Sequence, residues 1–241
     1  TGCTSTNSAI QTVNVNLLPT ITATTSSNAI CMGGMVTLTA GGATTYTWTN
    51  GVSNGVAFSP TITNNYTVTG TDGNGCQNMT TKAVTVNLLP VVSSTAVTNV
   101  LCNGGSGSAT ITVSGGTPGY SYLWSTGATA SVVAGTSGVY TATVTDVNSC
   151  KVTQSVTISQ PSALITTTAV TNPLCNGGTG SASVTATGGT GAYTYLWSTA
   201  ATTSVITSVS GVRTVTVTDA NNCTSIKSVS ISQPAIISSS I

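Results

Sequence analysis

The chain has 241 residues, only 3% of them charged, and its formal net charge is +1. It contains no His and no Glu, so the commonest general acids and bases are missing, and no basic field exists to hold nucleic acid or an anionic membrane. We therefore expect no enzyme, no nucleic-acid partner and no cofactor. Hydrophobic residues make up 39% of the chain, enough for a buried core, but no apolar run is long enough for a membrane helix.

Residues 1–19 resemble the end of a later segment. The stretch GCTSTNSAIQTVNVNLLP at positions 2–19 matches GCQNMTTKAVTVNLLP at positions 75–90. We expect residues 1–19 to be the last strand of a truncated preceding domain. Residues 20–90 would then form a whole domain, with Cys31 near its start, TYTW ending at Trp48, and NYTVTGTDGNGC ending at Cys76.

The rest of the chain is an internal repeat, the sequence signature of a tandem array. Two segments align without a gap, AVTNVLCNGGSGSATITVSGG and AVTNPLCNGGTGSASVTATGG, and the motifs YLWST and ISQP each occur twice. The period is 73 residues, since 175−102 = 73 for cysteine and 197−124 = 73 for tryptophan. We expect one repeat at 91–161, a second at 162–234, and the start of a further repeat at 235–241.

Within each repeat the pattern of side chains has a period of two. Ala109, Ile111 and Val113 alternate with hydroxyl residues, and Gly, Asn, Ser and Asp separate such runs. Alternation of this kind indicates half-buried antiparallel strands joined by turns. The sequence therefore predicts an all-β protein, built from tandem small immunoglobulin-like (PKD-like) β-sandwiches in an extended string. On this interpretation residues 1–19 end a truncated Ig-like domain.

The two long copies resemble the SprB-type repeats of Bacteroidetes gliding-motility and cell-surface adhesins. The resemblance lies in the order CNGG…YLWST…TVTD…C…ISQP, while residues 20–90 resemble the PKD-like or Ig-like modules found beside such repeats. It implies a long protein, exported by type IX secretion and displayed outside the bacterial cell. Its partners would be neighbouring repeats of the same polypeptide, with lateral self-assembly into a filament and O-linked glycans as further expectations.

The seven cysteines favour extracellular disulfides over a zinc site, because no His and no CxxC pair is present. One scheme pairs them within domains, as Cys31–Cys76, Cys102–Cys150 and Cys175–Cys223, and leaves Cys3 to a partner outside the chain. This scheme is preferred, but the two cysteines of each pair would lie at opposite ends of an immunoglobulin sandwich. The alternative links neighbouring domains, as Cys31–Cys150 and Cys102–Cys223, and leaves Cys3, Cys76 and Cys175 to partners outside the chain.

The tryptophans Trp48, Trp124 and Trp197 each end a strand that is rich in aromatic residues. Surface tryptophans stack on sugars, but a sandwich needs a core tryptophan, so we expect all three in the core. Tyr66 and Tyr140 resemble the tyrosine corner of such sandwiches and are also expected in the core. The third copy has Arg213 at that position. We expect that arginine to reach the surface or stack on a ring, because it cannot copy the tyrosine contact in an apolar site without a partner.

The three acidic residues, Asp72, Asp146 and Asp219, lie in TDGNGC, TDVNSC and TDANNC. A calcium loop needs several oxygen ligands and usually a distal Glu, which this chain lacks. We therefore expect Asp turns without metal. The leading functional hypothesis is the shaft of a secreted cell-surface fibre or adhesin. The alternative is a module whose loops capture a glycan, which would require a unique cluster in one repeat.

Overall fold

The computed structural model describes residues 11–237 and is built almost entirely of β-strands. Its one helical element in this range is the short 3₁₀ turn η1, Thr49–Gly51. The strands form six sheets, which we describe as three consecutive two-sheet sandwiches. Part of the expected strand at 1–19 lies outside the described residues, and residues 11–19 carry no strand. The same holds for most of 235–241, where positions 238–241 are outside the described part.

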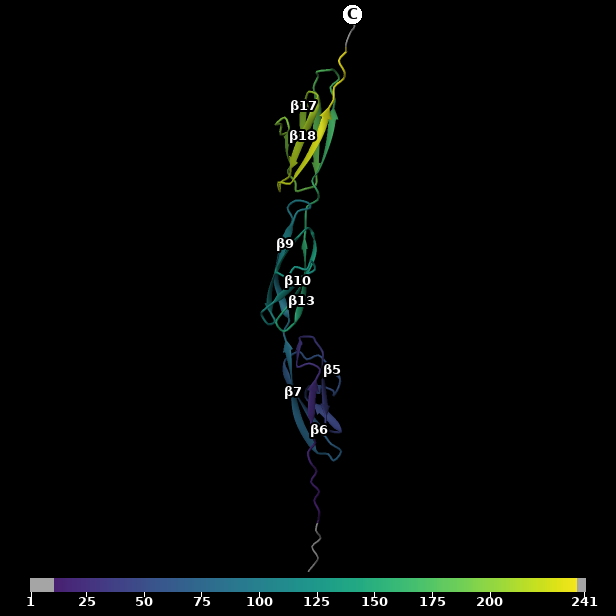
Figure 1. The fold of residues 1–241 in the computed structure, drawn as a ribbon, viewed down its shortest axis with the longest axis vertical. Helices are drawn as coiled ribbons and strands as arrows, with labels where there is room; N and C mark the ends of the chain where they lie inside the picture. The colour runs from purple at the N-terminus through teal and green to yellow at the C-terminus, as the bar shows by residue number, and fades with distance from the viewer. Residues whose placement is uncertain (1–10, 238–241) are drawn as a thin grey trace, which may run out of the picture. The chain divides into compact units, whose positions relative to one another are not determined.

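The first sandwich has a three-stranded and a four-stranded sheet. In spatial order these are β1 (Thr22–Thr25), β3 (Val36–Gly41) and β5 (Ala57–Phe58), and then β2 (Ala29–Cys31), β7 (Gln77–Asn87), β6 (Asn64–Thr71) and β4 (Thr45–Trp48). Strands β2 and β7 are parallel, whereas β6 and β7 form an antiparallel hairpin, visible at the lower end of Figure 1.

The second and third sandwiches share one plan, with three strands in each sheet. The sheets of the second are β11 (Val132–Gly135), β9 (Gly107–Gly115) and β8 (Pro90–Thr98), and β10 (Ser121–Trp124), β12 (Gly138–Thr145) and β13 (Lys151–Ile158). The sheets of the third are β14 (Ile165–Thr171), β15 (Gly180–Thr187) and β17 (Val205–Ser208), and β16 (Thr194–Trp197), β18 (Gly211–Thr218) and β19 (Thr224–Ile231).

Each sandwich buries the apolar half of its alternating strands. In β12 every second residue from Tyr140 to Val144 is buried, and the threonines between them are half-buried. The same pattern repeats in β18 from Val215. The core of the third sandwich contains Ala182, Val184, Trp197, Ile206, Val215, Val217, Val229 and Ile231. A period-two sequence thus gives one apolar face per sheet, and two such faces pack together.

The fold is immunoglobulin-like because the buried aromatic side chains occupy the positions that this fold requires. A buried tryptophan ends β4, β10 and β16, and a buried tyrosine lies near the start of β6 and β12. The protein is therefore all-β, with Ig-like sandwiches in tandem. By density of contacts the chain divides into two compact units. The first reaches Val91 and includes Ser114–Tyr120 and Thr145–Val152, and the second comprises the other residues.

Candidate functional site

The first part of the site is an Asp turn that precedes the last strand of each sandwich. The Asp72 carboxylate accepts the backbone N–H groups of Asn74 and Cys76, each at 2.9 Å. Asp219 accepts the equivalent pair from Asn221 and Cys223, and its second oxygen accepts the Thr190 N–H at 2.9 Å. The carboxylate therefore holds both its own turn and the neighbouring loop.

Asp146 makes the same contacts in the second sandwich, and both it and Asp219 are buried. The Thr117 N–H lowers the pKa of Asp146 below its ordinary value, burial opposes the shift, and the N–H groups of Cys150 and Asn148 add to it. The pKa of Asp219 is lowered in the same way, first by the Thr190 N–H. Hydrogen bonds to the charged form thus keep both carboxylates ionised.

The second part of the site is a Cys-x-Gly-Gly turn near the start of each sandwich. The N–H of the second glycine donates to the cysteine carbonyl, at 2.8 Å for Cys31, 2.9 Å for Cys102 and 3.1 Å for Cys175. The first glycine of each turn has a positive φ, +80° at Gly104 for example, which favours glycine at this place.

Each of these turns is attached to the far end of the last strand of its sandwich. In the second sandwich the Gly104 N–H donates to Gln160 Oε1 at 2.8 Å, and Asn103 Nδ2 donates to the Pro161 carbonyl. Gln233 and Asn176 make the same contacts in the third. In the first sandwich the cysteine turn is attached through the backbone, since the Met32 N–H donates to the Asn87 carbonyl. Sequence reasoning missed the two glutamines, although the repeated ISQP was their signal.

The cysteines of the two kinds of turn join consecutive sandwiches. Cys31 is bonded to Cys150 and Cys102 to Cys223, with Cα–Cα distances of 5.5 and 5.6 Å. The preferred within-domain scheme is therefore wrong, and the alternative pairing is the observed one. Each disulfide lies inside one of the two compact units.

The reason is the length of the last strand. Cys31 pairs with Asn87 at the end of β7, whereas Cys76 directly precedes Gln77 at its beginning. Ten residue steps at about 3.3 Å put these ends about 33 Å apart, far beyond the reach of a disulfide. The same geometry separates Cys102 from Cys150 and Cys175 from Cys223, because each pair flanks β13 or β19.

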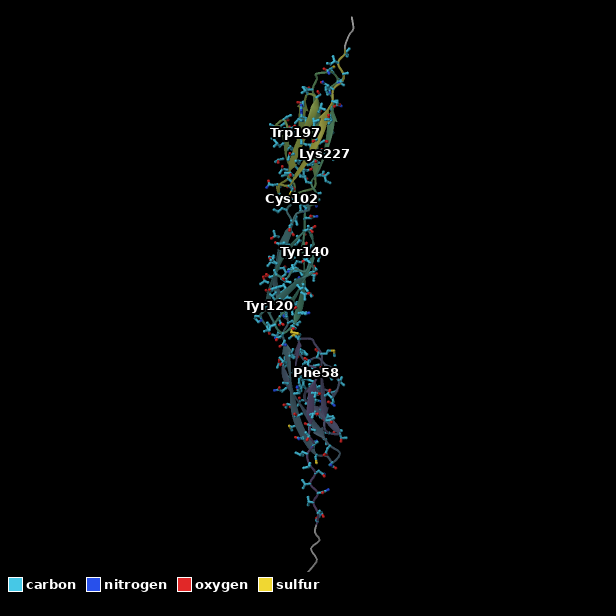
Figure 2. The ribbon with its side chains drawn as sticks, in the orientation of Figure 1. Phe58, Cys102, Tyr120, Tyr140, Trp197 and Lys227 are labelled. Atoms are coloured by element: carbon cyan, nitrogen blue, oxygen red, sulfur yellow. A yellow bond between two sulfur atoms is a disulfide. The ribbon has the colours of Figure 1, made fainter. Side chains whose placement is uncertain are left out.

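Polar contacts accompany the Cys102–Cys223 disulfide. Asn221 Nδ2 donates to the Leu101 carbonyl at 3.1 Å, and the groove around the bond is closed by Asn222, Cys223 and Thr224. Cys102 is labelled in Figure 2. Cys76 and Cys175 are free cysteines, half-buried and exposed respectively. Cys3 lies outside the described residues.

The tyrosine corner differs between the two repeats. The Tyr140 hydroxyl donates to the Thr136 carbonyl at 2.7 Å, four residues upstream. Arg213 Nη2 donates to the equivalent carbonyl of Val209 at 3.4 Å, and its Nε donates to Ser208 Oγ at 2.8 Å. An arginine was expected to be unable to copy this contact without a partner, and here the neighbouring Ser208 supplies that partner. In the first sandwich, Tyr66 packs edge-on against Phe58.

The tryptophans are 2–5% exposed, and each indole N–H donates inside its own sandwich. The acceptors are Asn54 Oδ1, the Ala130 carbonyl and the Thr203 carbonyl. These rings are therefore not open to sugars. Within residues 11–237 no three His, Cys, Asp or Glu side chains gather as metal ligands. Among the helices of that same range, none is long and apolar enough to span a membrane.

Comparisons with solved structures give several immunoglobulin-like likenesses. The eight N-terminal Ig domains of Down syndrome cell adhesion molecule match at 14% identity and a TM-score of 0.48, over 86% of this chain but 35% of that one. The titin I-band fragment I67–I69 matches at 12% identity and a TM-score of 0.43, over 91% of this chain and all of that fragment. A Ca²⁺-stabilized adhesin that helps an Antarctic bacterium reach out and bind ice matches at 17% identity and a TM-score of 0.37. This match covers 90% of this chain and 74% of that one.

Strand order and the positions of the buried aromatic residues identify the immunoglobulin-like fold. No curated protein matches the chain. The SprB repeat family matches residues 94–129 and 167–202, which hold the first half of each 73-residue copy, including the Cys-x-Gly-Gly turn and the buried tryptophan. The chain thus carries two SprB repeats, preceded by an Ig-like module.

Proposed function

We propose that the chain is a structural repeat segment, the shaft of a long secreted cell-surface fibre or adhesin, without enzymatic activity. The observation that carries this proposal is that each junction between sandwiches is spanned twice, by the backbone and by a disulfide. Two SprB repeats support a role in a repeat-built protein of the cell surface. Export by type IX secretion, gliding motility, O-linked glycans and lateral assembly belong to the same proposal.

The proposed organisation is an extended string of domains at 20–90, 91–161 and 162–234. A disulfide beside the linker restrains bending and twisting of one sandwich against the next, which suits an element that sets reach and transmits tension. An enzyme would need a nucleophile with a base, but the carboxylates of Asp146 and Asp219 are occupied by backbone N–H groups.

The glycan-binding alternative has less support, because no repeat has a polar or aromatic cluster of its own. A shallow groove at Leu196, Trp197, Ser198, Thr214 and Thr216 has the same residue types 73 positions earlier. Arg213, a charged side chain where the second repeat has Tyr140, is bonded to Ser208 and nearby carbonyls of its own sandwich.

Small-angle X-ray scattering of the oxidised 241-residue chain tests the proposal. Strands of eight residues span about 25 Å, so a string of three sandwiches should give an elongated particle about 100 Å long or more. A compact, near-spherical particle would overturn the shaft. Specific binding on a glycan array, lost on substitution of loop residues in a single repeat, would favour the binding module instead.

A further inference from the structure

The two disulfides that join consecutive sandwiches differ in how deeply their cysteines are buried. Cys150 is 0% exposed, whereas its partner Cys31 is half-buried. Cys102 and Cys223 are both half-buried. One bond therefore has a cysteine that is closed to solvent, and the other bond has none.

A groove of about 390 Å³ lies beside the Cys102–Cys223 bond. Both cysteines line it, together with Asn222, Thr224 and Ala163, which are all exposed. These residues belong to one compact unit of the chain. The volume falls within the range of about 300–1,000 Å³ that is typical of small-molecule sites. A small reagent can therefore approach this disulfide from solvent.

The segment that links consecutive sandwiches also differs between the two junctions. Ala163 is exposed, and its equivalent one period earlier, since 163−90 = 73, is Pro90, which is buried. A buried proline at the first junction agrees with the buried Cys150 there. A small, exposed alanine at the second junction agrees with the open groove.

We propose that the Cys102–Cys223 disulfide is a thiol-reactive site, whose groove admits a low-molecular-weight thiol that attacks the Cys223 sulfur. The Cys31–Cys150 bond resists the same reagent, because releasing the buried Cys150 as a charged thiolate carries a large desolvation cost. The covalent tie between the two repeats is therefore reversible under conditions in which the tie at the preceding junction persists. This inference goes beyond the proposed shaft and does not depend on it.

The carbonyl groups around Cys223 decide which sulfur is attacked. Cys223 Sγ lies 3.5 Å from the Leu101 carbonyl oxygen and 4.0 Å from the Asn221 carbonyl oxygen. A thiolate formed on this sulfur faces the negative ends of both carbonyl dipoles, so Cys223 is the poorer leaving group. Attack at Cys223 instead leaves the negative charge on Cys102. The first product therefore carries the added thiol on Cys223 and a free thiol on Cys102.

The covalent reaction is a thiol–disulfide exchange in two steps. The small-molecule thiolate attacks Cys223 Sγ, the bond between the two protein sulfurs breaks, and its electron pair leaves on Cys102 Sγ, which takes a proton from water. A second small-molecule thiolate then attacks the added sulfur and releases Cys223. The protein disulfide is thereby reduced to two thiols, and two small-molecule thiols are oxidised to one disulfide.

The experiment treats the oxidised full chain with β-mercaptoethanol and follows each disulfide by mass spectrometry of acid-quenched, alkylated digests. To leave only the bonded cysteines reactive, every variant carries Cys3→Ser, Cys76→Ser and Cys175→Ser. We expect Cys102–Cys223 to be reduced at least about tenfold faster than Cys31–Cys150. The early adduct should lie on Cys223, with Cys102 alkylated.

A substitution that fills the groove tests access directly. Ala163→Phe adds a ring to the groove wall and should slow reduction of Cys102–Cys223 at least about threefold. Ala169→Phe is the matched control, because Ala169 is exposed on β14 and is not among the residues that line the groove. The control should leave the rate unchanged.

Equal reduction rates for the two disulfides, an early adduct on Cys102, or equal rates for Ala163→Phe and Ala169→Phe would each overturn the proposal. The first two measurements need no groove variant, so they decide the matter even if Ala163→Phe does not fold. None of these results changes the scattering of the oxidised chain. Failure of this reactive site is therefore distinguishable from failure of the proposed shaft.

Discussion

At the scale of single residues, the acidic side chains act as local clamps. Asp146 and Asp219 are buried and ionised, and each joins its own turn to the loop at Thr117 or Thr190. Their carboxylate oxygens face N–H donors, which is the opposite of what a cation needs from its ligands. The charge of each Asp thus serves the turn and the loop beside it.

This arrangement predicts the acid stability of the chain. A folded-state pKa below the unfolded value gives stability that is complete above about pH 4 and is lost as pH falls through the folded pKa. Because Glu and His are absent, the melting temperature should stay flat from pH 7 to about 4.5 and fall only below that.

The check is thermal unfolding from pH 7 to 2. Asp146→Asn with Asp219→Asn should melt lower at pH 7 but show a flatter decline below pH 4. Asp72→Asn is the control and should keep the steeper decline, because the other two carboxylates remain. Parallel curves for all three proteins would contradict the assignment.

The arginine corner is a coupled change at two positions. In the second sandwich, a Cβ at Gly135 would collide with the Tyr140 hydroxyl, so only glycine leaves room for that ring. The third sandwich has Ser208 at the equivalent place, and its hydroxyl accepts from Arg213. A tyrosine at the corner therefore occurs with glycine at the facing position, and the arginine occurs with serine there.

We expect Arg213→Tyr alone to destabilise the third sandwich by about 1–3 kcal/mol, since the new ring would collide with Ser208. Adding Ser208→Gly should recover most of this loss. A double-mutant cycle by urea unfolding measures the coupling, which should be about 1 kcal/mol or more. Additive effects of the two substitutions would show that the sites are independent.

At the scale of elements, the strands and the aromatic core follow from local pattern. Alternation of Ala, Ile and Val with hydroxyl residues specifies which face of a strand is buried, without reference to any distant residue. The disulfide pairing does not follow in this way. Every copy places cysteines at the same two positions. Pairing within copies and pairing between neighbouring copies therefore both repeat regularly along the chain, and the cysteine positions alone do not distinguish them. Only the direction and length of β7, β13 and β19 decide between them.

The glutamine contact is an element-level feature that can be tested alone. Gln160→Ala removes the acceptor of the Gly104 N–H and should cost about 1 kcal/mol. It should also speed reduction of Cys102–Cys223 by a mild thiol, because the Cys102 turn loses its attachment to β13. Gln233→Ala makes the matched change at the Cys175 turn and should leave that reduction rate unaltered. Equal rates for both variants would refute the attachment.

At the scale of the whole molecule, each sandwich has its own core, and the two disulfides overlap along the chain. The loop closed by Cys31–Cys150 contains Cys102, and the loop closed by Cys102–Cys223 contains Cys150. Each disulfide closes a loop of roughly 120 residues, which raises the free energy of the unfolded state by about 5 kcal/mol in the chain-entropy model. Since the loops interlock, reducing either bond alone frees only part of the chain.

These interlocked loops also set how far the chain can lengthen after its sandwiches have unfolded. The shortest covalent route from residue 20 to residue 237 runs along 20–31, crosses to Cys150, returns to Cys102 against the chain direction, and crosses to Cys223. Only about a third of the residues then carry tension, a contour of about 250 Å against about 740 Å after reduction. Stretching single molecules with and without a reducing agent should reveal this difference. The disulfides would thus act as a strain limiter, arresting extension when the folded structure has already given way.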